Sequence, residues 1–457
     1  MKRLFTEYLV EWKDSLNRKP LIIRGARQVG KSYIVKYFAQ KHFSDIITLN
    51  FEEQEELKQV FQTYNTEQII LNLETLFGKK IIANHTLLFF DEVQACPNAI
   101  IALRYFYEKH PELHIIAAGS LLDHALNNMK SSMPVGRVEF AYMYPMSFYE
   151  FLWALGENLS VEYLQNYTLK QEISLPIHNK LLELIRVYYI VGGMPEAVKV
   201  YVQSKSILEV HKVHESLIRS LEYDFSKYGN SSQRDIMNRL LNYIPKTIGN
   251  KFKYANFDNS IRSNAIRNAL HLMKMSRLIH FIHSSKSNDI PLQYGVNEKV
   301  FKLVFLDIGL SNHILKLRLT DISTKSIFNE GSLAEQFVGQ ELFTLPPCYL
   351  DNAIYYWARE KRNSEAELDY LLESGRTIIP IEVKAGKTGK LKSLQIYVSE
   401  KKIEKAIRFY ASPPSAVVSE TSIKVDKKMQ EVRYQLLSLP FYLIREAERL
   451  IQDLNIK

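Results

Sequence analysis

The segment from residue 24 to residue 33 reads RGARQVGKSY, and its two glycines, lysine and serine have the spacing of a phosphate-binding loop. Gly25 and Gly30 let backbone N–H groups curl around phosphate oxygens, while Lys31 can reach the terminal phosphates and Ser32 can hold Mg²⁺. The pattern predicts a site for ATP with Mg²⁺, and the alternative is a plain turn before a helix. The residues expected to contact the nucleotide are Gly25, Ala26, Arg27, Gln28, Val29, Gly30, Lys31, Ser32 and Tyr33.

Two acids follow the apolar run Leu87 to Phe90, which is typical of a buried parallel strand. At the end of such a strand we expect Asp91 to hold Mg²⁺ and Glu92 to orient and deprotonate the attacking water. Ser120 ends another apolar run, where its hydroxyl would touch the γ-phosphate or that water. The alternative for Ser120 is an ordinary helix N-cap.

Nucleotide hydrolysis often needs an arginine to neutralise the charge that builds on the γ-phosphate. Arg137, in the segment SMPVGRVEF, is the residue that we expect to do this. Arg104, on the amphipathic helix after the acidic pair, is its competitor. A surface salt bridge is the alternative for either arginine.

A second group of acids lies near the end of the chain, in the segment EAELDYLLESGRTIIPIEVKAG. Its alternating pattern around Ser374-Gly375 predicts a hairpin in which Asp369 faces Pro380. Pro380 cannot donate a ladder hydrogen bond, so we expect a bulge or an unpaired side there. Strict alternation puts Leu368, Tyr370 and Leu372 on a dry face. The residues expected on the opposite, wet face are Glu367, Asp369, Glu382 and Lys384.

Two carboxylates beside a lysine can bind a divalent metal and activate water against a phosphodiester, so Asp369, Glu382 and Lys384 form a candidate metal site. Glu335 is the candidate for an additional acid from an earlier helix. Its alternative is structural, because Ser332 and Glu335 have the spacing of a capping box. For the hairpin residues, the alternative is a charged solvent face.

These side chains require particular elements to position them. After the glycine loop, Ile34, Val35 and Phe38 recur at helical spacing, and a short apolar run precedes it. Similar apolar runs at 46–51 and 114–120 are separated by helical patterns. We therefore expect a parallel α/β sheet with the nucleotide at its carboxyl edge.

The middle of the chain is helical in pattern up to residue 230, and the segment that follows resembles a winged helix, with helices before two strand-like runs. On the second expected helix, four polar residues share a face that could enter a DNA major groove. The alternative is a solvated face on a helix that packs between domains. The four residues are Asn264, Arg267, His271 and Lys274.

The order of motifs along the chain resembles a widespread family of bacterial and archaeal AAA+ ATPases with a C-terminal domain of unknown function. The resemblance is carried by IIRGARQVGKS, LLFFDEVQ, IIAAGSLL, PVGRVEFAYMYPMSFYEFL, YYIVGGMPEAV, DFSKY, FKLVFLDIGL and PIEVKAG. It implies the sensor position for Ser120 and a restriction-endonuclease-like fold for the tail. There, Asp369, Glu382 and Lys384 match the PD-(D/E)xK pattern. It also implies that a second copy of the chain is a partner.

Composition sets the outer limits of the interpretation. The 457 residues have a net charge of +9, which favours a polyanionic partner such as DNA or RNA without requiring one. The two cysteines, Cys96 and Cys348, have no metal-ligand spacing and predict a reducing compartment. No apolar run is long enough to cross a membrane, so we expect a cytoplasmic protein.

The sequence thus predicts a multidomain α/β protein with four parts. They are an AAA+ type P-loop ATPase domain at 1–160, a helical segment at 161–230, a winged-helix-like domain at 231–310 and a restriction-endonuclease-like domain at 311–457. The first hypothesis is an Mg-dependent ATPase that acts on nucleic acid. The alternatives are an NTP-controlled switch or scaffold with a silent tail, and a winged-helix transcription regulator.

Overall fold

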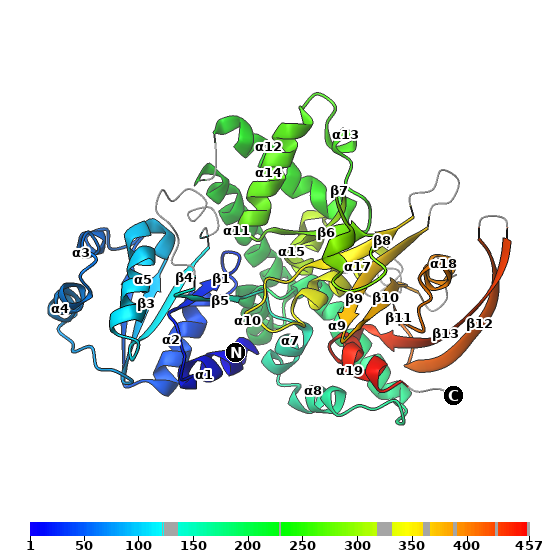
Figure 1. Cartoon of the computed structure of the whole chain (residues 1–457), viewed down its shortest axis with the longest axis horizontal. Helices are drawn as coiled ribbons and strands as arrows, with labels where there is room; N and C mark the ends of the chain where they lie inside the picture. The colour runs from blue at the N-terminus through cyan, green and yellow to red at the C-terminus, as the bar shows by residue number, and fades with distance from the viewer. Residues whose placement is uncertain are drawn as a thin grey trace. The chain divides into compact units, whose positions relative to one another are not determined.

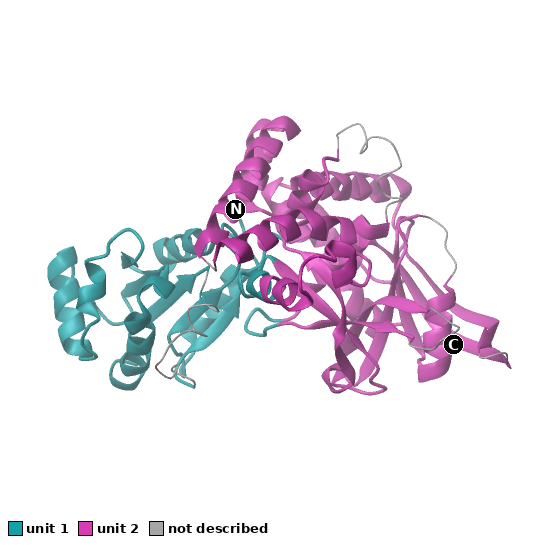
Figure 2. Cartoon of the chain, turned by 90° about the horizontal axis from the view of Figure 1, so that it is seen from above, with its two compact units in different colours: residues 1–146, 271–278, 347–351 teal, residues 147–270, 279–346, 352–457 magenta. Residues whose placement is uncertain are grey.

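The computed structural model describes residues 1–120, 122, 136–227, 230–317, 331–359, 366–386, 391–425 and 428–454 (Figure 1). The chain divides into two compact units, drawn in two colours in Figure 2. The first unit comprises residues 1–146, 271–278 and 347–351, and the second comprises residues 147–270, 279–346 and 352–457. The four ranges predicted from the sequence stay a prediction.

The first unit is built on a five-stranded sheet in which every neighbouring pair is parallel. The strand order is β2-β3-β4-β1-β5, so β4 separates the strand before the glycine loop from the strand that ends in the acidic pair. This confirms the parallel α/β sheet predicted for the start of the chain. The strands are β1 (Leu21–Arg24), β2 (Asp45–Asn50), β3 (Thr86–Asp91), β4 (His114–Gly119) and β5 (Glu139–Tyr142).

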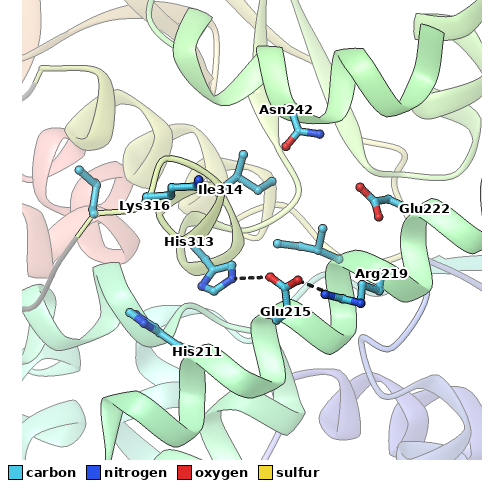
Figure 3. A pocket seen from close by; sticks show the side chains of 10 residues that line it. His211, Glu215, Arg219, Glu222, Asn242, His313, Ile314 and Lys316 are labelled. Atoms are coloured by element: carbon cyan, nitrogen blue, oxygen red, sulfur yellow. Dashed lines mark hydrogen bonds and ion pairs between the residues drawn. The ribbon is translucent and has the colours of Figure 1, made fainter. Parts of the chain in front are cut away.

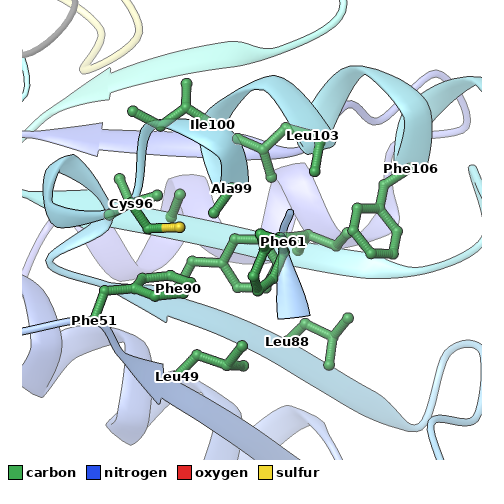
Figure 4. Packing of buried hydrophobic residues seen from close by; sticks show 14 of the residues in the cluster. Leu49, Phe51, Phe61, Leu88, Phe90, Cys96, Ala99, Ile100, Leu103 and Phe106 are labelled. Carbon is green, nitrogen blue, oxygen red and sulfur yellow. The ribbon is translucent and has the colours of Figure 1, made fainter. Parts of the chain in front are cut away.

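Helices cover both faces of this sheet because its central strands are buried throughout. On one face, Phe51, Phe61 and Phe90 pack edge to face, with ring centroids 5.4 Å apart for Phe51–Phe61 and for Phe61–Phe90 (Figure 4). Cys96 is buried in the same cluster, and both cysteines are free thiols. The helices of this unit are α1 (Phe5–Asp14), α2 (Lys31–His42), α3 (Leu57–Val60), α4 (Thr66–Phe77) and α5 (Pro97–Lys109), with a 3₁₀ turn at Val93–Ala95.

The second unit begins with a helical region. One helix of this unit, α17 (Gly331–Phe343), is buried around nearly its whole circumference, so its polar side chains need internal partners. Gln336 binds the backbone of Phe305 in both directions, and Gln340 accepts a hydrogen bond from Ile308 N. The other helices are α7 (Phe148–Ala154), α8 (Asn158–Gln165), α9 (Leu175–Val191), α10 (Pro195–Ser204), α11 (Ile207–Asp224), α12 (Ser231–Tyr243), α13 (Tyr254–Phe257), α14 (Ser263–Met275, which also contributes to the first unit), α15 (Ile308–Ile314), α18 (Lys392–Lys401) and α19 (Ala447–Gln452).

An eight-stranded mixed sheet forms the rest of this unit, in the order β12-β13-β11-β10-β9-β8-β6-β7. The strands are β6 (Ile279–Ser285), β7 (Val296–Phe305), β8 (Ile354–Ala358), β9 (Glu367–Ser374), β10 (Thr377–Val383), β11 (Lys405–Tyr410), β12 (Ser415–Val425) and β13 (Lys428–Pro440). Short 3₁₀ helices lie at Phe225–Lys227, Ile244–Thr247, Leu292–Gly295 and Phe441–Glu446.

The two strands expected for a wing are β6 and β7, and they do pair in antiparallel fashion. They are not a separate hairpin, however, because β6 also pairs with β8 and so joins the large sheet. The winged helix is therefore not confirmed. The restriction-endonuclease-like fold is also not confirmed, although a mixed sheet does occupy the predicted region.

The β9–β10 hairpin differs from the predicted register. Ser374 pairs with Thr377, so the two-residue turn is Gly375-Arg376 rather than Ser374-Gly375. Gly375 has φ 58°, which a glycine adopts without steric cost. Pro380 pairs with Leu371 of β9, so no bulge lies on that side, but the pairing of β10 with β11 begins only at Ile381, which leaves the other side of Pro380 unpaired as predicted.

The irregularity lies instead in β9, on its other side. Between two successive pairs with β8, Tyr355↔Leu371 and Trp357↔Leu368, β9 advances three residues (371 − 368) while β8 advances two (357 − 355). The additional residue interrupts strict alternation, as a β-bulge does. Consequently Leu368 and Leu371 belong to one apolar cluster with Trp357, and the predicted grouping of Leu368 with Tyr370 is wrong.

Among the residues that the structure describes, no helix has the length and apolar character that crossing a membrane requires.

Candidate functional site

The loop between β1 and α2 has the backbone geometry that its glycines permit. Gly30 has φ 95°, which an L side chain rarely adopts. A Cβ at Gly25 would lie 2.3 Å from the carbonyl oxygen of Met143, so no side chain fits there. Gln28 also has a positive φ of 64°. The loop is therefore a tight cradle that leads directly into the N-terminus of α2.

Lys31 lies inside this cradle and is 7% exposed. Its ammonium donates to the carbonyl oxygens of Gly25 at 3.0 Å and Ala26 at 2.8 Å. Burial lowers the pKa of Lys31 to about 8, although the charges of Glu92 and Asp91 oppose that shift. A partly desolvated cation at the mouth of a backbone cradle suits a phosphate.

The two expected magnesium ligands are in direct contact. Ser32 Oγ donates to Asp91 Oδ1 at 2.9 Å, across the gap between α2 and the end of β3. Burial raises the pKa of Asp91, while the Ser32 hydrogen bond lowers it. A hydroxyl and a carboxylate are the oxygen ligands that Mg²⁺ prefers beside a triphosphate, so these residues fit the ion.

Glu92, the expected base, has φ 49° and lies just beyond the strand. Gln94 was not predicted from the sequence, yet its amide Nε2 donates to Glu92 Oε2 at 2.6 Å. Gln94 Oε1 lies beside Gly119, where an added Cβ would be 2.0 Å away. Ser120 is 5% exposed, and its hydroxyl has no hydrogen-bond partner among the described residues. Ser120 thus lies at the end of β4 with an unused hydrogen-bonding group.

The remaining loop residues have different environments. Ala26 and Val29 are buried, whereas Tyr33 is 54% exposed and stacks on Tyr37. Arg27 forms an ion pair with Glu52 at 3.5 Å.

A buried arginine that the sequence did not single out supports the loop. Arg3 donates to the carbonyl oxygens of Val29 at 3.0 Å and Tyr144 at 2.7 Å, so it connects the start of the chain to the loop. Only the fold brings Arg3 to this position, 26 residues before its partner in the loop.

Both candidate arginines bind the same carboxylate. Arg137 and Arg104 donate to Glu108 Oε1 at 3.0 Å and 3.1 Å. Arg137 precedes β5, whose first residue pairs with Leu21 at the amino end of β1. The loop follows the other end of β1, roughly 13 Å farther along at about 3.3 Å per residue. The structure thus places Arg137 at the edge of the sheet opposite the cradle.

In the second unit, the structure brings together Glu367, Asp369, Glu382 and Lys384, which the sequence placed on one face, and the additional acid Glu335. It also adds Lys302 from β7, which was not predicted. Lys302 is 3% exposed, and its ammonium lies 2.7 Å from Glu367, 3.3 Å from Glu335 and 3.8 Å from Asp369. Lys384 forms an ion pair with Glu382 Oε1 at 2.5 Å. We call these six residues the acidic cluster.

Most of the acidic cluster is buried, which corrects the prediction of a solvated face for all but Glu367 and Lys384, whose side chains are 30% and 28% exposed. The side chains of Asp369 and Glu382 are only 14% and 6% exposed. Burial raises the pKa of Glu335 to about 8 and that of Glu382 to about 7, and in each case the charge of Asp369 raises it further. Burial alone would lower the pKa of Lys302, but the charges of Glu335, Asp369 and Glu367 outweigh it and raise that pKa.

A cavity of about 710 Å³ in the second unit contains a histidine pair that the sequence did not suggest (Figure 3). His313 shares Glu215 with Arg219, at 3.2 Å and 3.0 Å, and the ring of His211 lies 5.3 Å from that of His313. The cavity is lined by both acidic and basic side chains, so its charge does not favour one class of ligand. Over the described parts of the chain, no set of three or more metal-ligating side chains has the geometry to hold a metal ion.

The polar face expected on α14 is exposed. The structure leaves all four of its residues on the surface, while Ile266, Ala269 and Met273 of the same helix are buried. This distribution is the amphipathic pattern that the sequence predicted. The four exposed residues are Asn264, Arg267, His271 and Lys274.

Three family models match the chain. Residues 17–152 match an AAA domain, residues 182–321 match a domain of unknown function, DUF8612, and residues 330–436 match another, DUF4143. The first match covers the sheet, the glycine loop and the acidic pair. The first unit therefore contains a P-loop ATPase domain of the AAA type.

Among curated proteins, an uncharacterised protein of Methanocaldococcus jannaschii, MJ1544, is 24% identical over 395 residues, which are 85% of this chain and 78% of that protein. Among solved structures, the Walker-type ATPase PABY2304 of Pyrococcus abyssi is 15% identical with a TM-score of 0.44, covering 69% of this chain and 95% of its own. The Aeropyrum pernix ORC2 protein, in its ADPNP-ADP complexes, is 13% identical with a TM-score of 0.36, covering 68% of this chain and 93% of its own.

Proposed function

We propose that the first unit binds Mg-ATP in the cradle between β1 and α2 and hydrolyses it. The contact between Ser32 Oγ and Asp91 Oδ1, at 2.9 Å beside a buried Lys31, carries this proposal. It joins the glycine loop to the end of β3, which the sequence separates by 59 positions. A plain turn before a helix would not need that connection.

Each residue has a distinct part in this proposal. Lys31 would exchange its carbonyl partners for phosphate oxygens and offset their charge. Glu92 would accept the proton of the attacking water. Gln94 would orient the Glu92 carboxylate through the 2.6 Å hydrogen bond between the two side chains. Ser120 would use its unpaired hydroxyl on the γ-phosphate or on that water. Mg²⁺, held by Ser32 and Asp91, would supply charge neutralisation on the phosphates.

Arg137 can serve this chemistry only in another copy of the chain, because it lies at the sheet edge opposite its own cradle. We therefore propose that any arginine finger formed by Arg137 acts between copies. Its ion pair with Glu108 would have to open for that contact.

The second candidate function is an ATP-controlled switch whose second unit binds a partner without cutting it. Lys302 favours this over a nuclease, since its ammonium already forms ion pairs with Glu335 and Asp369, two of the carboxylates that would have to hold a metal. Action on nucleic acid stays part of the proposal. It is supported by the net charge of +9 and by the exposed polar face of α14.

The test is Mg-ATP titration by calorimetry together with a phosphate-release assay on the full chain, with and without DNA or RNA. We expect Lys31→Ala to weaken ATP binding by about 100-fold, the loss of a buried charge contact. We expect Glu92→Gln to bind normally but to hydrolyse about 100-fold more slowly. The matched control is Lys41→Ala, an exposed lysine of the same helix. A wild-type chain that does not bind Mg-ATP would end the proposal.

A further inference from the structure

A polar cavity of about 580 Å³ lies in the second unit, beside the acidic cluster but facing outward. Three lysines line it, Lys246, Lys251 and Lys253, from the segment between α12 and α13. Asn250 and Asn256 add amide groups that can donate hydrogen bonds, whereas the hydroxyl of Thr247 already donates to Ile244 O at 2.9 Å. Among the described residues, no carboxylate forms an ion pair with Lys246 or Lys253. The cavity therefore presents positive charge that is not neutralised by its neighbours.

Glu367 connects this cavity to the acidic cluster. It lines the cavity, where Lys251 reaches its Oε2 at 3.0 Å, and its Oε1 binds Lys302 at 2.7 Å from the interior. Glu367, the one acid among the described residues of the cavity wall, is thus shared between two lysines. With three lysines and a doubly neutralised carboxylate, the wall has a net positive charge.

The acids of the acidic cluster do not cancel the positive charge of the cavity, because Lys302 already pairs with three of them. Its ammonium lies within 3.8 Å of three carboxylates, in the position that a divalent cation would need in order to bind the same oxygens. A metal ion there would meet a fixed positive charge at contact distance. The acidic cluster therefore does not fit a divalent metal, because a tethered cation already occupies the place.

We propose that the cavity formed by Lys246, Lys251 and Lys253 binds a phosphate-type oxyanion, and that Lys302 acts as the internal counter-ion that keeps the adjoining acidic cluster free of metal. Ammonium groups supply charge-assisted hydrogen bonds to such an anion, and the side-chain amides of Asn250 and Asn256 can add further hydrogen bonds. The second unit thereby holds a phosphate-bearing ligand next to a nuclease-like arrangement of acids and leaves it intact. This assignment is independent of nucleotide binding in the first unit.

The binding test uses the full chain with Lys31→Ala, so that the cradle in the first unit does not contribute. Inorganic phosphate is titrated by calorimetry, and a fluorescent single-stranded oligonucleotide by anisotropy. We expect Lys246→Ala with Lys253→Ala to weaken binding by about tenfold or more, since two charged contacts are lost. The matched control is Lys424→Ala with Lys428→Ala, two exposed lysines outside the cavity, which should change it less than about twofold.

The two probes separate the sources of the anion. Saturable binding of phosphate, which then displaces the oligonucleotide, identifies a site for a free oxyanion. Binding of the oligonucleotide alone identifies a site for a polynucleotide backbone. Binding of neither probe, or an equal loss in the control variant, overturns the proposal.

The counter-ion is tested with Mn²⁺ alone on the same chain. We expect no Mn²⁺ binding that depends on Glu382, so Glu382→Gln should leave the Mn²⁺ titration unchanged. Lys302→Met should gain a Mn²⁺ site and lose anion affinity, whereas Lys302→Arg should keep the wild-type pattern. Wild-type Mn²⁺ binding that Glu382→Gln removes would overturn the inference, and that measurement needs no variant of Lys302 to fold.

Discussion

Replacing Lys302 by Met should destabilise the second unit, and the loss should grow as the pH rises. The ammonium lies 2.7 Å, 3.3 Å and 3.8 Å from three carboxylates. At an effective dielectric constant of about 20, each contact has a gross attraction of roughly 4–6 kcal/mol, most of which offsets desolvation. Removing one member of a buried ion pair typically costs about 3–5 kcal/mol, and we expect that loss at about pH 8.5.

The dependence on pH follows from the raised pKa values of the acids. Glu335, with a pKa of about 8 against an ordinary 4.5, binds more protons in the folded than in the unfolded chain. Its charged form therefore opposes folding, and that contribution grows as the pH rises from about 4.5 to about 8. Without Lys302, protonation of Glu335 and Glu382 is the main relief available. At about pH 6 we thus expect the loss to be smaller by about 1–2 kcal/mol, at about 1.4 kcal/mol per pKa unit.

The assay is urea unfolding followed by tryptophan fluorescence in a Trp12→Phe background. The remaining tryptophans, Trp153 and Trp357, then both report on the second unit. Lys299→Met, an exposed lysine of the same strand, is the matched control and should change the unfolding free energy by less than about 0.5 kcal/mol. An equal loss at both pH values would refute the electrostatic reasoning, because simple loss of packing does not depend on pH.

Three further predictions concern the first unit. Gly119→Ala places a Cβ 2.0 Å from Gln94 Oε1, so it should displace Gln94 from Glu92 and lower kcat by about tenfold with little change in ATP affinity; an unchanged kcat would contradict the positioning role of Gln94. Arg3→Met removes two hydrogen bonds to loop-supporting carbonyls and should lower the unfolding free energy of this unit by about 2–4 kcal/mol and weaken ATP binding, both measurable by thermal unfolding with and without Mg-ATP. Asp91→Asn should reduce the gain in ATP affinity that Mg²⁺ provides, which calorimetry with and without EDTA would show; a gain equal to that of the wild type would exclude Asp91 as a ligand.

The phosphate cradle could be predicted from the sequence because its signal is local. Two glycines, a lysine and a serine within eight positions determine the turn, and the adjacent apolar runs identify the strand and the helix. Asp91 and Glu92 could also be predicted from the sequence, since an apolar run that ends in two acids is a local pattern. Gln94 lies only two positions farther on, but no spacing rule distinguishes it from an ordinary turn residue.

The hairpin of the second unit shows where local reasoning loses accuracy. The alternating pattern predicted that strands β9 and β10 would pair, and they do. The position of the turn was wrong by one residue, because the requirement of Gly375 for a positive φ determines which residues form the loop. The bulge in β9 could not be predicted, since it depends on the pairing with β8, a separate strand.

The sequence by itself determined the groups available to this protein, namely a glycine loop with the spacing of a phosphate-binding motif and a set of acids near the end of the chain. Only the tertiary structure decided how those groups are used. Lys302 lies 33 positions from Glu335 and farther from the hairpin, and pattern reasoning cannot pair residues that only sheet assembly brings together. Folding places its ammonium among three of the acids, where it supplies part of the counter-charge that buried carboxylates require.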